Sequence, residues 1–274
     1  MYSPSQSIIK MKNINVKNLI LGKNVIIEPS VVIRGPNGPA NYVEIGDNTY
    51  IGHDTHIICD DFSIGEYGKL HNHGYVHGYK PCKIGHNAWI GQNTIIDSIG
   101  GTTIGDNCGI GAHSQLWSHI KYGDTLEGCR FLSDSPLNVG KDVWFVGHCI
   151  VSPITAEDKS MALVGSVVTR DMKKNHIYAG SPAKDITDKA GNQFNEVSVE
   201  EKYKKMCLYL EEFEGIIGTK DHDIVITKTQ KEFVNNKSCF SVSDRIYTKN
   251  LTELEQKFMR FLLPEKAKFT PHKG

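Results

Sequence analysis

Residues 104–120 read IGDNCGIGAHSQLWSHI, and the spacing of their apolar residues predicts the fold. Ile104, Ile110 and Leu116 lie at every sixth position, and glycine follows each of the two isoleucines. This spacing matches neither the turn of an α-helix, about 3.6 residues long, nor the simple alternation of a long strand. It suits a short strand that ends in a tight turn, with three such sides closing one triangular coil.

The same spacing recurs along residues 21–151 in sets of three hexads, and every departure from it falls between two sets. The sets are Leu21, Ile27 and Ile33; Ile45, Ile51 and Ile57; Ile64, Leu70 and Val76; Ile84, Ile90 and Ile96; Ile104, Ile110 and Leu116; and Val139, Phe145 and Val151. One coil cannot bury its apolar faces alone, so coils must stack as parallel strands roughly 4.8 Å apart. The sequence therefore predicts a mainly β domain over residues 1–189, a left-handed parallel β-helix of about seven coils.

Polar residues occupy two of the three predicted corners. The first corner has Asn24, Asn48, Tyr67, Asn87, Asn107 and Asp142, and the second has Ser30, Asp54, His73, Asn93, His113 and His148. Asn, Asp and His tolerate positive φ better than most residues, so turn formation accounts for most of this ladder. Insertions fall at the third corner, the longest at about 120–138, and loops on a rigid scaffold often carry function.

The hexad period ends near residue 190, and residues 190–274 predict a small α+β domain. Ser198 and Glu201 form a capping-box pattern ahead of a helix that ends near Gly215. Strand-like stretches follow at 223–227 and 238–248, and a second helix runs from about Thr252 to Leu263, where Pro264 stops it.

The overall composition narrows the class of partners. Lys plus Arg and Asp plus Glu both number 31, and no block of like charge predicts binding to nucleic acid or to a membrane surface. The seven cysteines form no CxxC pair, which argues against a disulfide framework or a zinc knuckle. The N-terminal stretch lacks a signal core and no long apolar run occurs, so we expect a cytoplasmic protein.

The repeats, together with the stretch LVGSVVTRDMKKNHIYAGSPAKDI at 163–186, resemble the hexapeptide-repeat acyltransferases. The GxPAK ending is similar to that of the sugar acetyltransferase branch. The resemblance implies a homotrimer that takes its acyl group from acetyl-CoA in a groove between subunits. It also implies that Gly165, Ser166, Ala179 and Gly180 line this groove and that Arg170 and Lys184 meet the nucleotide phosphates. Glycine admits a close ligand and lysine is a good point charge for phosphate, so these residue types fit the role.

Three histidines are candidates for the catalytic base, because an imidazole with a pKa of about 6.5 accepts a proton at neutral pH. His119 in QLWSHI resembles the histidine of the galactoside and maltose acetyltransferases, although it arrives two residues earlier than theirs. His86 in KIGHNAWIG resembles the histidine of bacterial amino-sugar N-acetyltransferases, and His113 lies one side away from His119. A fourth alternative needs no protein base, because a sugar amine attacks without prior deprotonation whereas a hydroxyl does not.

The stretch KLHNHGYVHGYKPC at 69–82 raises the alternative of a metal hydratase similar to the γ-class carbonic anhydrases. Its histidines are spaced two, four and six apart, however, and HGY stands where that class has HGC, so we expect no metal. We interpret the stretch as part of an acceptor pocket, with tyrosine faces for a sugar ring. The expected substrate-binding residues are His71, His73, Tyr75, His77, Tyr79, Asp97, Trp117 and Arg130.

Together these features predict a trimeric acetyl-CoA-dependent acetyltransferase that acts on a sugar. The first expectation is N-acetylation of a nucleotide-linked amino sugar for surface glycan synthesis, such as lipopolysaccharide biosynthesis. An O-acetyltransferase that acts on a sugar hydroxyl is the main alternative. The metal hydratase and an inactive trimeric scaffold stay open as further alternatives.

Overall fold

The computed structural model describes residues 13–263 and 265–272. Contacts divide the chain into two compact units, Met1–Gln193 and Phe194–Gly274. The division lies four residues after the predicted boundary at 189. Two expectations, the absence of an N-terminal signal core and the stop at Pro264, concern residues outside the described part.

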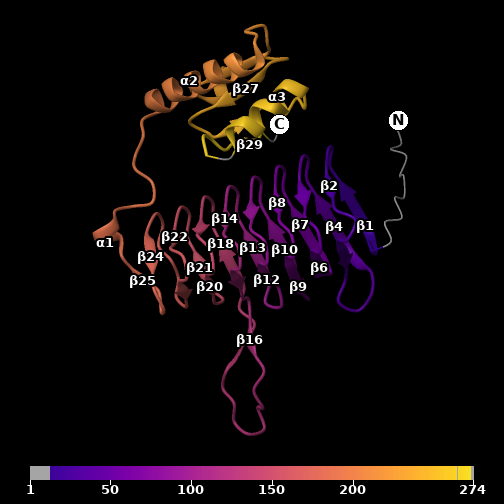
Figure 1. Ribbon diagram of the computed structural model, residues 1–274. Coiled ribbons are helices and arrows are strands. Elements are labelled where there is room, and N and C mark those ends of the chain that lie inside the picture. Colours follow the sequence, from indigo (N-terminus) through magenta and orange to yellow (C-terminus); the bar gives the residue numbers. More distant parts are fainter. Residues whose placement is uncertain (1–12, 264, 273–274) are drawn as a thin grey trace. The chain divides into compact units, whose positions relative to one another are not determined.

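The first unit is a stack of coils whose strands form three parallel sheets (Figure 1). The first sheet contains β1 (Val16–Leu21), β4 (Ala40–Ile45), β7 (Asp61–Ile64), β10 (Cys82–Ile84), β13 (Thr102–Ile104), β18 (Leu137–Val139) and β21 (Thr155–Ala156). The second contains β2 (Ile26–Ile27), β5 (Tyr50–Ile51), β8 (Lys69–Leu70), β11 (Trp89–Ile90), β14 (Gly109–Ile110), β19 (Trp144–Phe145), β22 (Met161–Ala162) and β24 (Ile177–Ala179), with β25 (Lys184–Asp185) antiparallel at its edge. The third contains β3 (Val32–Arg34), β6 (His56–Cys59), β9 (Tyr75–Gly78), β12 (Ile95–Asp97), β15 (Gln115–Leu116), β20 (Ile150–Val151) and β23 (Val167–Val168). These strands make seven complete coils in the described residues, which confirms the predicted left-handed parallel β-helix.

The hexad residues form the core of the β-helix. Ile84 pairs in register with Ile64 on one side and Ile104 on the other, and all three are buried. Burying each such side chain contributes roughly 1.5–3 kcal/mol. The glycine that follows is required by the spacing of the coils, because a Cβ at Gly85 would lie 2.7 Å from the carbonyl carbon of Gly105.

The polar corner residues adopt the predicted left-handed conformation. Asn87 and Asn107 at the first corner have φ of 56° and 64°, and His73 and His113 at the second have 59° and 60°. Ser30 uses its side chain instead: its hydroxyl accepts a hydrogen bond from the amide of Asp54 on the next coil. Turn formation therefore explains these polar positions without a catalytic role.

A long loop leaves the β-helix at the third corner (Figure 1). It begins with β16 (Ile120–Lys121), which pairs antiparallel with β17 (Leu132–Ser133). The chain rejoins the β-helix at β18, where Leu137 is buried and pairs with Thr102. The loop therefore spans 120–136, and a short helix, α1 (Thr187–Ala190), follows the last strand of the β-helix.

The second unit packs two helices with a small sheet. Its elements are α2 (Val199–Ile217), β26 (Ile224–Thr227), η1 (Gln230–Glu232), β27 (Ser238–Ser241), β28 (Ile246–Tyr247), α3 (Glu253–Leu262) and β29 (Thr270–Pro271). The capping box of Ser198 and Glu201 forms as predicted, but the helix continues to Gly218, whose φ of 74° ends it. The predicted strand stretch 238–248 is two antiparallel strands, β27 and β28. Buried Phe240, Tyr247 and Phe258 form the core of this unit.

Candidate active site

A buried carboxylate lies at the end of β12, beside the corner from which the long loop leaves. Asp97 is completely inaccessible to solvent. Its Oδ2 accepts hydrogen bonds from the Ser118 amide (2.9 Å), from the Ser118 hydroxyl (2.6 Å) and from Nδ1 of His119 (2.8 Å). Burial of a charged group requires such partners, so the three donors hold the carboxylate in one position.

His119 follows β15 and is oriented by this carboxylate. Because a carboxylate oxygen only accepts hydrogen bonds, Nδ1 of His119 must carry the proton. In the neutral imidazole the lone pair then belongs to Nε2, and the side chain is still 20% exposed. This is the arrangement of a general base whose tautomer is fixed by a buried acid.

The backbone around this pair is held by Ser118 and Gly100. The Ser118 hydroxyl donates to Asp97 and also accepts a hydrogen bond from the Gly100 amide at 2.9 Å. A Cβ at Gly100 would lie 2.0 Å from the carbonyl oxygen of Ser118 and 2.6 Å from that of Asp134, at the base of the loop. Ser118 was not among the residues expected from the sequence, and its place between Trp117 and His119 was the available signal.

A second histidine shares the carboxylate. Nδ1 of His77 lies 3.7 Å from Oδ1 of Asp97, and β9 and β12 pair these two residues in register. Burial lowers the pKa of His77, the negative charge of Asp97 opposes this, and a positive charge on His119 lowers the pKa further. His77 is therefore neutral at pH 7, which leaves His119 as the histidine that the carboxylate supports directly.

Aromatic side chains flank the two histidines. The ring centroid of Tyr75 lies 5.0 Å from that of His77, and Trp117 meets His119 edge-on at 6.1 Å. Tyr75 is 41% exposed and Trp117 is half-buried. Of the residues expected to bind substrate, the structure thus brings together Tyr75, His77, Asp97 and Trp117. Asp97, however, is too deeply buried to present its side chain to a ligand, and it holds His119 instead.

The structure gives His86 a structural role. Its Nδ1 accepts a hydrogen bond from the Glu66 amide at 3.1 Å, as Asp106 accepts one from the His86 amide on the next coil. Because the donor is a backbone N–H, the proton of the neutral ring must be on Nε2. The ring lone pair of this tautomer is on Nδ1, and the hydrogen bond from the Glu66 amide already occupies it. This argues against the catalytic role expected for His86.

His113 also lies apart from Asp97. It occupies the second corner, where its ring stacks on that of His148 at 4.8 Å with an angle of 12°. His73 occupies the same corner and faces Asp54. His71 lies on the outer face of the second sheet against Trp89, and burial lowers its pKa. These three histidines are not part of the cluster around Asp97.

Two further residues expected at the acceptor pocket are exposed on the loops of the third corner. Tyr79 follows β9 and is 62% exposed, and Arg130 lies within the 120–136 loop. Neither has an interaction with the cluster around Asp97 that would fix its side chain there. Cys59 on β6 is no nucleophile, because burial, together with the charge of Asp97, raises the pKa of its thiol to about 12.

The residues expected to bind CoA lie on the last coils. Arg170 and Lys184 are exposed, and Gly165 and Gly180 have positive φ of 71° and 99°. A Cβ at Gly165 would meet no atom within 4 Å, so its surface is open. The amides of Gly165 and Ser166 already donate to the carbonyl oxygens of Gly147 and Leu163. This segment fits a ligand through open glycine surface and cationic side chains, with Ala179 beside Lys184 in the β24–β25 pair.

Neither a metal centre nor a membrane span emerges from the described residues. No group of three or more His, Cys, Asp or Glu side chains in residues 13–263 and 265–272 is arranged to hold a metal ion. Within the same ranges, no helix has both the length and the apolar character needed to cross a membrane.

No protein-family profile matches the sequence, but individual proteins do. The galactoside O-acetyltransferase of Escherichia coli (strain K12) is 32% identical over 114 residues, which cover 38% of this chain and 55% of that protein. Nodulation protein L of Rhizobium meliloti is 34% identical over 103 residues, covering 37% of this chain and 56% of that protein. The chain thus spans about half the length of these relatives.

A comparison with solved structures gives matches of low sequence identity. The hexapeptide-repeat acetyltransferase VCA0836 of Vibrio cholerae, in complex with acetyl coenzyme A, is 18% identical with a TM-score of 0.36 and covers 52% of this chain and 68% of that one. The sequence relatives confirm the resemblance to the hexapeptide-repeat sugar acetyltransferases that the repeats and the GxPAK ending indicate.

Proposed function

We propose that this protein is an acetyltransferase that moves an acetyl group from acetyl-CoA to a sugar, with His119 as the general base. The observation that carries the proposal is the 2.8 Å hydrogen bond between Nδ1 of His119 and the buried Asp97. It fixes the tautomer in which Nε2 accepts a proton, at the corner of the scaffold from which the long loop leaves. Acyl transfer to a poorly acidic group requires such a base.

The presence of a base indicates whether an oxygen or a nitrogen of the sugar is acetylated. A sugar hydroxyl has a pKa far above neutral and must lose its proton as it attacks, whereas an amine attacks through its own lone pair. A base held by one hydrogen bond to a carboxylate, which Ser118 fixes with two more, therefore favours O-acetylation, and the relative from E. coli is a galactoside O-acetyltransferase. N-acetylation of a nucleotide-linked amino sugar, the first expectation from the sequence, stays a prediction.

Each residue of the cluster has a separate task in this proposal. Nε2 of His119 takes the proton of the acceptor hydroxyl as its oxygen bonds to the thioester carbonyl carbon, and returns that proton to the CoA thiolate that leaves when the C–S bond breaks. Asp97 stabilises the imidazolium in between, and Ser118 keeps the carboxylate in place. The faces of Tyr75 and Trp117 offer apolar surface to a sugar ring. General-base assistance of this kind contributes about 10²–10⁴ in rate.

Acetyl-CoA would supply the activated thioester when bound. The exposed cations Lys184 and Arg170 would attract its phosphates, and the open surface at Gly165 would admit the chain of the pantetheine arm. Ala179, Gly180 and Ser166 line the same segment. Binding here would bring no charge into a buried region, because both cationic side chains are exposed.

We also infer that the enzyme is a homotrimer, as the resemblance implies. The 120–136 loop supports this, because Leu126 and Phe131 are 91% and 73% exposed and gain by burial against a neighbouring copy. Light scattering of the purified protein tests the trimer. The cytoplasmic location and a role in surface glycan synthesis stay predictions from the sequence.

One assay distinguishes the alternatives. Thiol release from acetyl-CoA is measured with methyl galactoside, with maltose and with nucleotide-linked amino sugars, and the products are treated with hydroxylamine. We expect release with a hydroxyl acceptor and a product that hydroxylamine cleaves, as it cleaves esters and leaves amides intact. A resistant product would establish N-acetylation. Absence of release with every sugar would contradict the enzyme and leave the inactive scaffold.

A further inference from the structure

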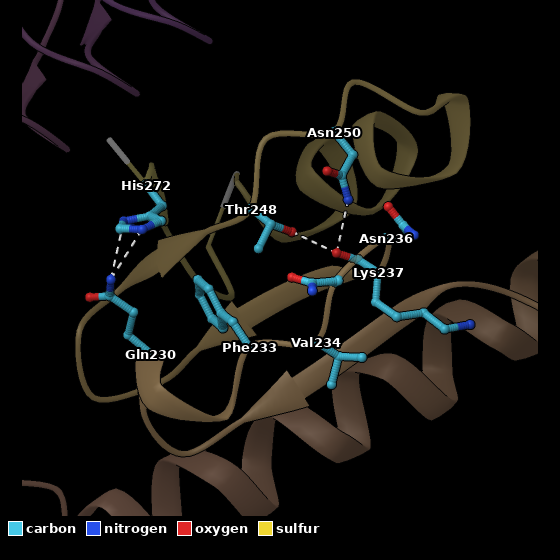
Figure 2. A pocket seen from close by; sticks show the side chains of 9 residues that line it. Gln230, Phe233, Val234, Asn236, Lys237, Thr248, Asn250 and His272 are labelled. Atoms are coloured by element: carbon cyan, nitrogen blue, oxygen red, sulfur yellow. Dashed lines mark hydrogen bonds between the residues drawn. The ribbon is translucent and has the colours of Figure 1, made fainter. Parts of the chain in front are cut away.

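The second unit contains an open pocket that the acyl-transfer proposal does not use. It has a volume of about 340 Å³. It lies between the segment 230–237, which begins with η1, and the residues that follow β28 (Figure 2). The lining residues are Gln230, Phe233, Val234, Asn235, Asn236, Lys237, Thr248, Asn250 and His272. The volume lies in the lower part of the range of small-molecule sites.

The pocket wall is held in place by hydrogen bonds to one carbonyl group. The carbonyl oxygen of Lys237 accepts from the Thr248 hydroxyl and from Nδ2 of Asn250, both at 2.8 Å (Figure 2). Thr248 in turn accepts from the Cys239 amide at 2.9 Å. This network links the 230–237 segment to β27 and β28, so the wall is fixed before any ligand arrives.

A buried acid fixes the position of Asn250. Glu255 on α3 is completely buried, and its two carboxylate oxygens accept hydrogen bonds from the amides of Asn250 (3.0 Å) and Leu251 (2.9 Å). Leu251 has a φ of 58°, which is costly for a branched side chain. Strained residues of this kind cluster at binding and catalytic sites, where the surrounding structure holds them.

The polar groups of the pocket are mostly carboxamides. The side chains of Asn235 and Asn236 make no hydrogen bond with any described residue, and the same is true of Oδ1 of Asn250. A carboxamide offers both a donor and an acceptor of hydrogen bonds. A hydroxyl group both donates and accepts, so the two groups can bond to each other in either direction. Phe233 adds an aromatic surface, with its ring edge-on to that of His272 at 5.9 Å.

The lining carries almost no charge. Lys237 is the one lysine or arginine among the nine lining residues, none of which is acidic. Its ammonium group forms an ion pair with Asp223, and Figure 2 shows its side chain extending away from Phe233. A phosphate or a carboxylate would find no free cation there, so the chemistry of the pocket fits an uncharged ligand with several hydroxyl groups.

We propose that the unit Phe194–Gly274 binds a neutral saccharide in this pocket, independently of acetyl transfer. Phe233 stacks against the C–H face of a sugar ring, while Asn235, Asn236 and Asn250 bond its hydroxyl groups. The site retains a carbohydrate on the protein without taking part in chemistry. A dissociation constant on the order of 1 mM is expected for a single sugar ring in an open site.

Saturation-transfer NMR and titration calorimetry on the full chain test the proposal, with D-glucose, D-galactose, N-acetyl-D-glucosamine and maltose as probes. Asn236→Gly removes a carboxamide and keeps the left-handed backbone, for which φ is 60°. Phe233→Leu removes the aromatic face and keeps apolar volume. Asn195→Gly, which removes an exposed carboxamide outside the pocket, is the matched control.

We expect at least one neutral sugar to bind and each pocket variant to weaken it by about threefold to tenfold, the effect of one lost hydrogen bond or stacking contact. The control variant should bind as the unaltered protein does. Thermal melting confirms that each variant is folded. Absence of binding by all four sugars at 20 mM would overturn the proposal. So would binding that Trp117→Ala abolishes and the pocket variants leave unchanged, because the sugar would then occupy the transferase site.

Discussion

Asp97→Asn tests whether the buried carboxylate acts through His119. The three donors that converge on Oδ2 leave no place there for an amide NH₂ group. The asparagine must therefore put its oxygen at that position and its nitrogen at the position of Oδ1, where it loses only the long hydrogen bond that Oδ1 accepts from the Ile99 amide at 3.4 Å. In this orientation His119 keeps its tautomer but loses the negative charge that stabilises the imidazolium.

The size of the effect follows from that loss. A hydrogen bond to a charged group contributes about 1.5–3 kcal/mol, against about 0.5–1.5 kcal/mol for a neutral one. A difference of about 1–1.5 kcal/mol lowers kcat by about 5- to 13-fold, with little change in the KM for acetyl-CoA. Asp97→Ala removes the orienting bond as well, and should lower kcat by about 10²–10⁴.

A double-mutant cycle measured by thiol release tests the reasoning. If Asp97 acts through His119, Asp97→Asn should cost less than about threefold in a His119→Ala background. Asp134→Asn is the matched control, because Asp134 is exposed on the loop and pairs with Lys80. An equal cost of Asp97→Asn in both backgrounds would refute this coupling and show that Asp97 acts independently of His119. Circular dichroism melting separates either result from unfolding.

Three further predictions concern other parts of the β-helix. His86→Asp should leave kcat within about threefold of normal in the thiol-release assay, because an aspartate also accepts the amide of the preceding coil; a hundredfold loss would restore His86 as a base candidate. Cys59 should not react with a thiol reagent in the folded protein at pH 8, since burial raises its pKa to about 12, whereas the half-buried Cys129 reacts; labelling followed by mass spectrometry decides. Burial raises the pKa of Asp185, but hydrogen bonds from Thr187 and the charge of His176 outweigh it and bring the pKa to about 2. A lowered pKa stabilises the fold above the unfolded value of about 3.9, and this stabilisation is lost as the pH falls through 2. Asp185→Asn should therefore lower stability to urea at pH 6 and make no difference near pH 2, and an equal effect at both would contradict the ionic contribution.

The fold could be predicted because each side of a coil requires one large apolar residue. Ile84, Ile90 and Ile96 are therefore visible in the sequence at the spacing that the structure shows. The seventh coil is harder to see, because Ala156 and Ala162 fill its first two core positions and give little hydrophobic signal.

The candidate site could be predicted only in part. From the sequence, His119, His86 and His113 are all candidates for the base. The discriminating facts are hydrogen bonds, which fix one tautomer in His119 and the opposite one in His86. The hydrogen-bond partner of His119 could, in principle, be identified from the sequence. Asp97 directly follows the core residue Ile96. Ile96 pairs in register with Leu116 on the next coil, so Asp97 lies beside the residues that follow Leu116, among them His119.

In the second unit, local signals predicted the helices better than the strands. The capping box at Ser198 fixes the start of α2 by local hydrogen bonds, so it is visible in the sequence. The division of 238–248 into β27 and β28 depends on tertiary pairing of Phe240 with Tyr247, which local sequence does not specify. The pocket has the same origin, since it depends on how separate segments meet around the carbonyl of Lys237.

The most direct test of the central claim is the rate of acetyl-CoA thiol release with a sugar hydroxyl acceptor, compared between the unaltered protein, His119→Ala and His113→Ala. The account predicts that His119→Ala lowers kcat by about 10² or more at an unchanged KM for acetyl-CoA, while His113→Ala stays within about threefold. Near-normal turnover in folded His119→Ala would contradict the claim that this histidine moves the proton.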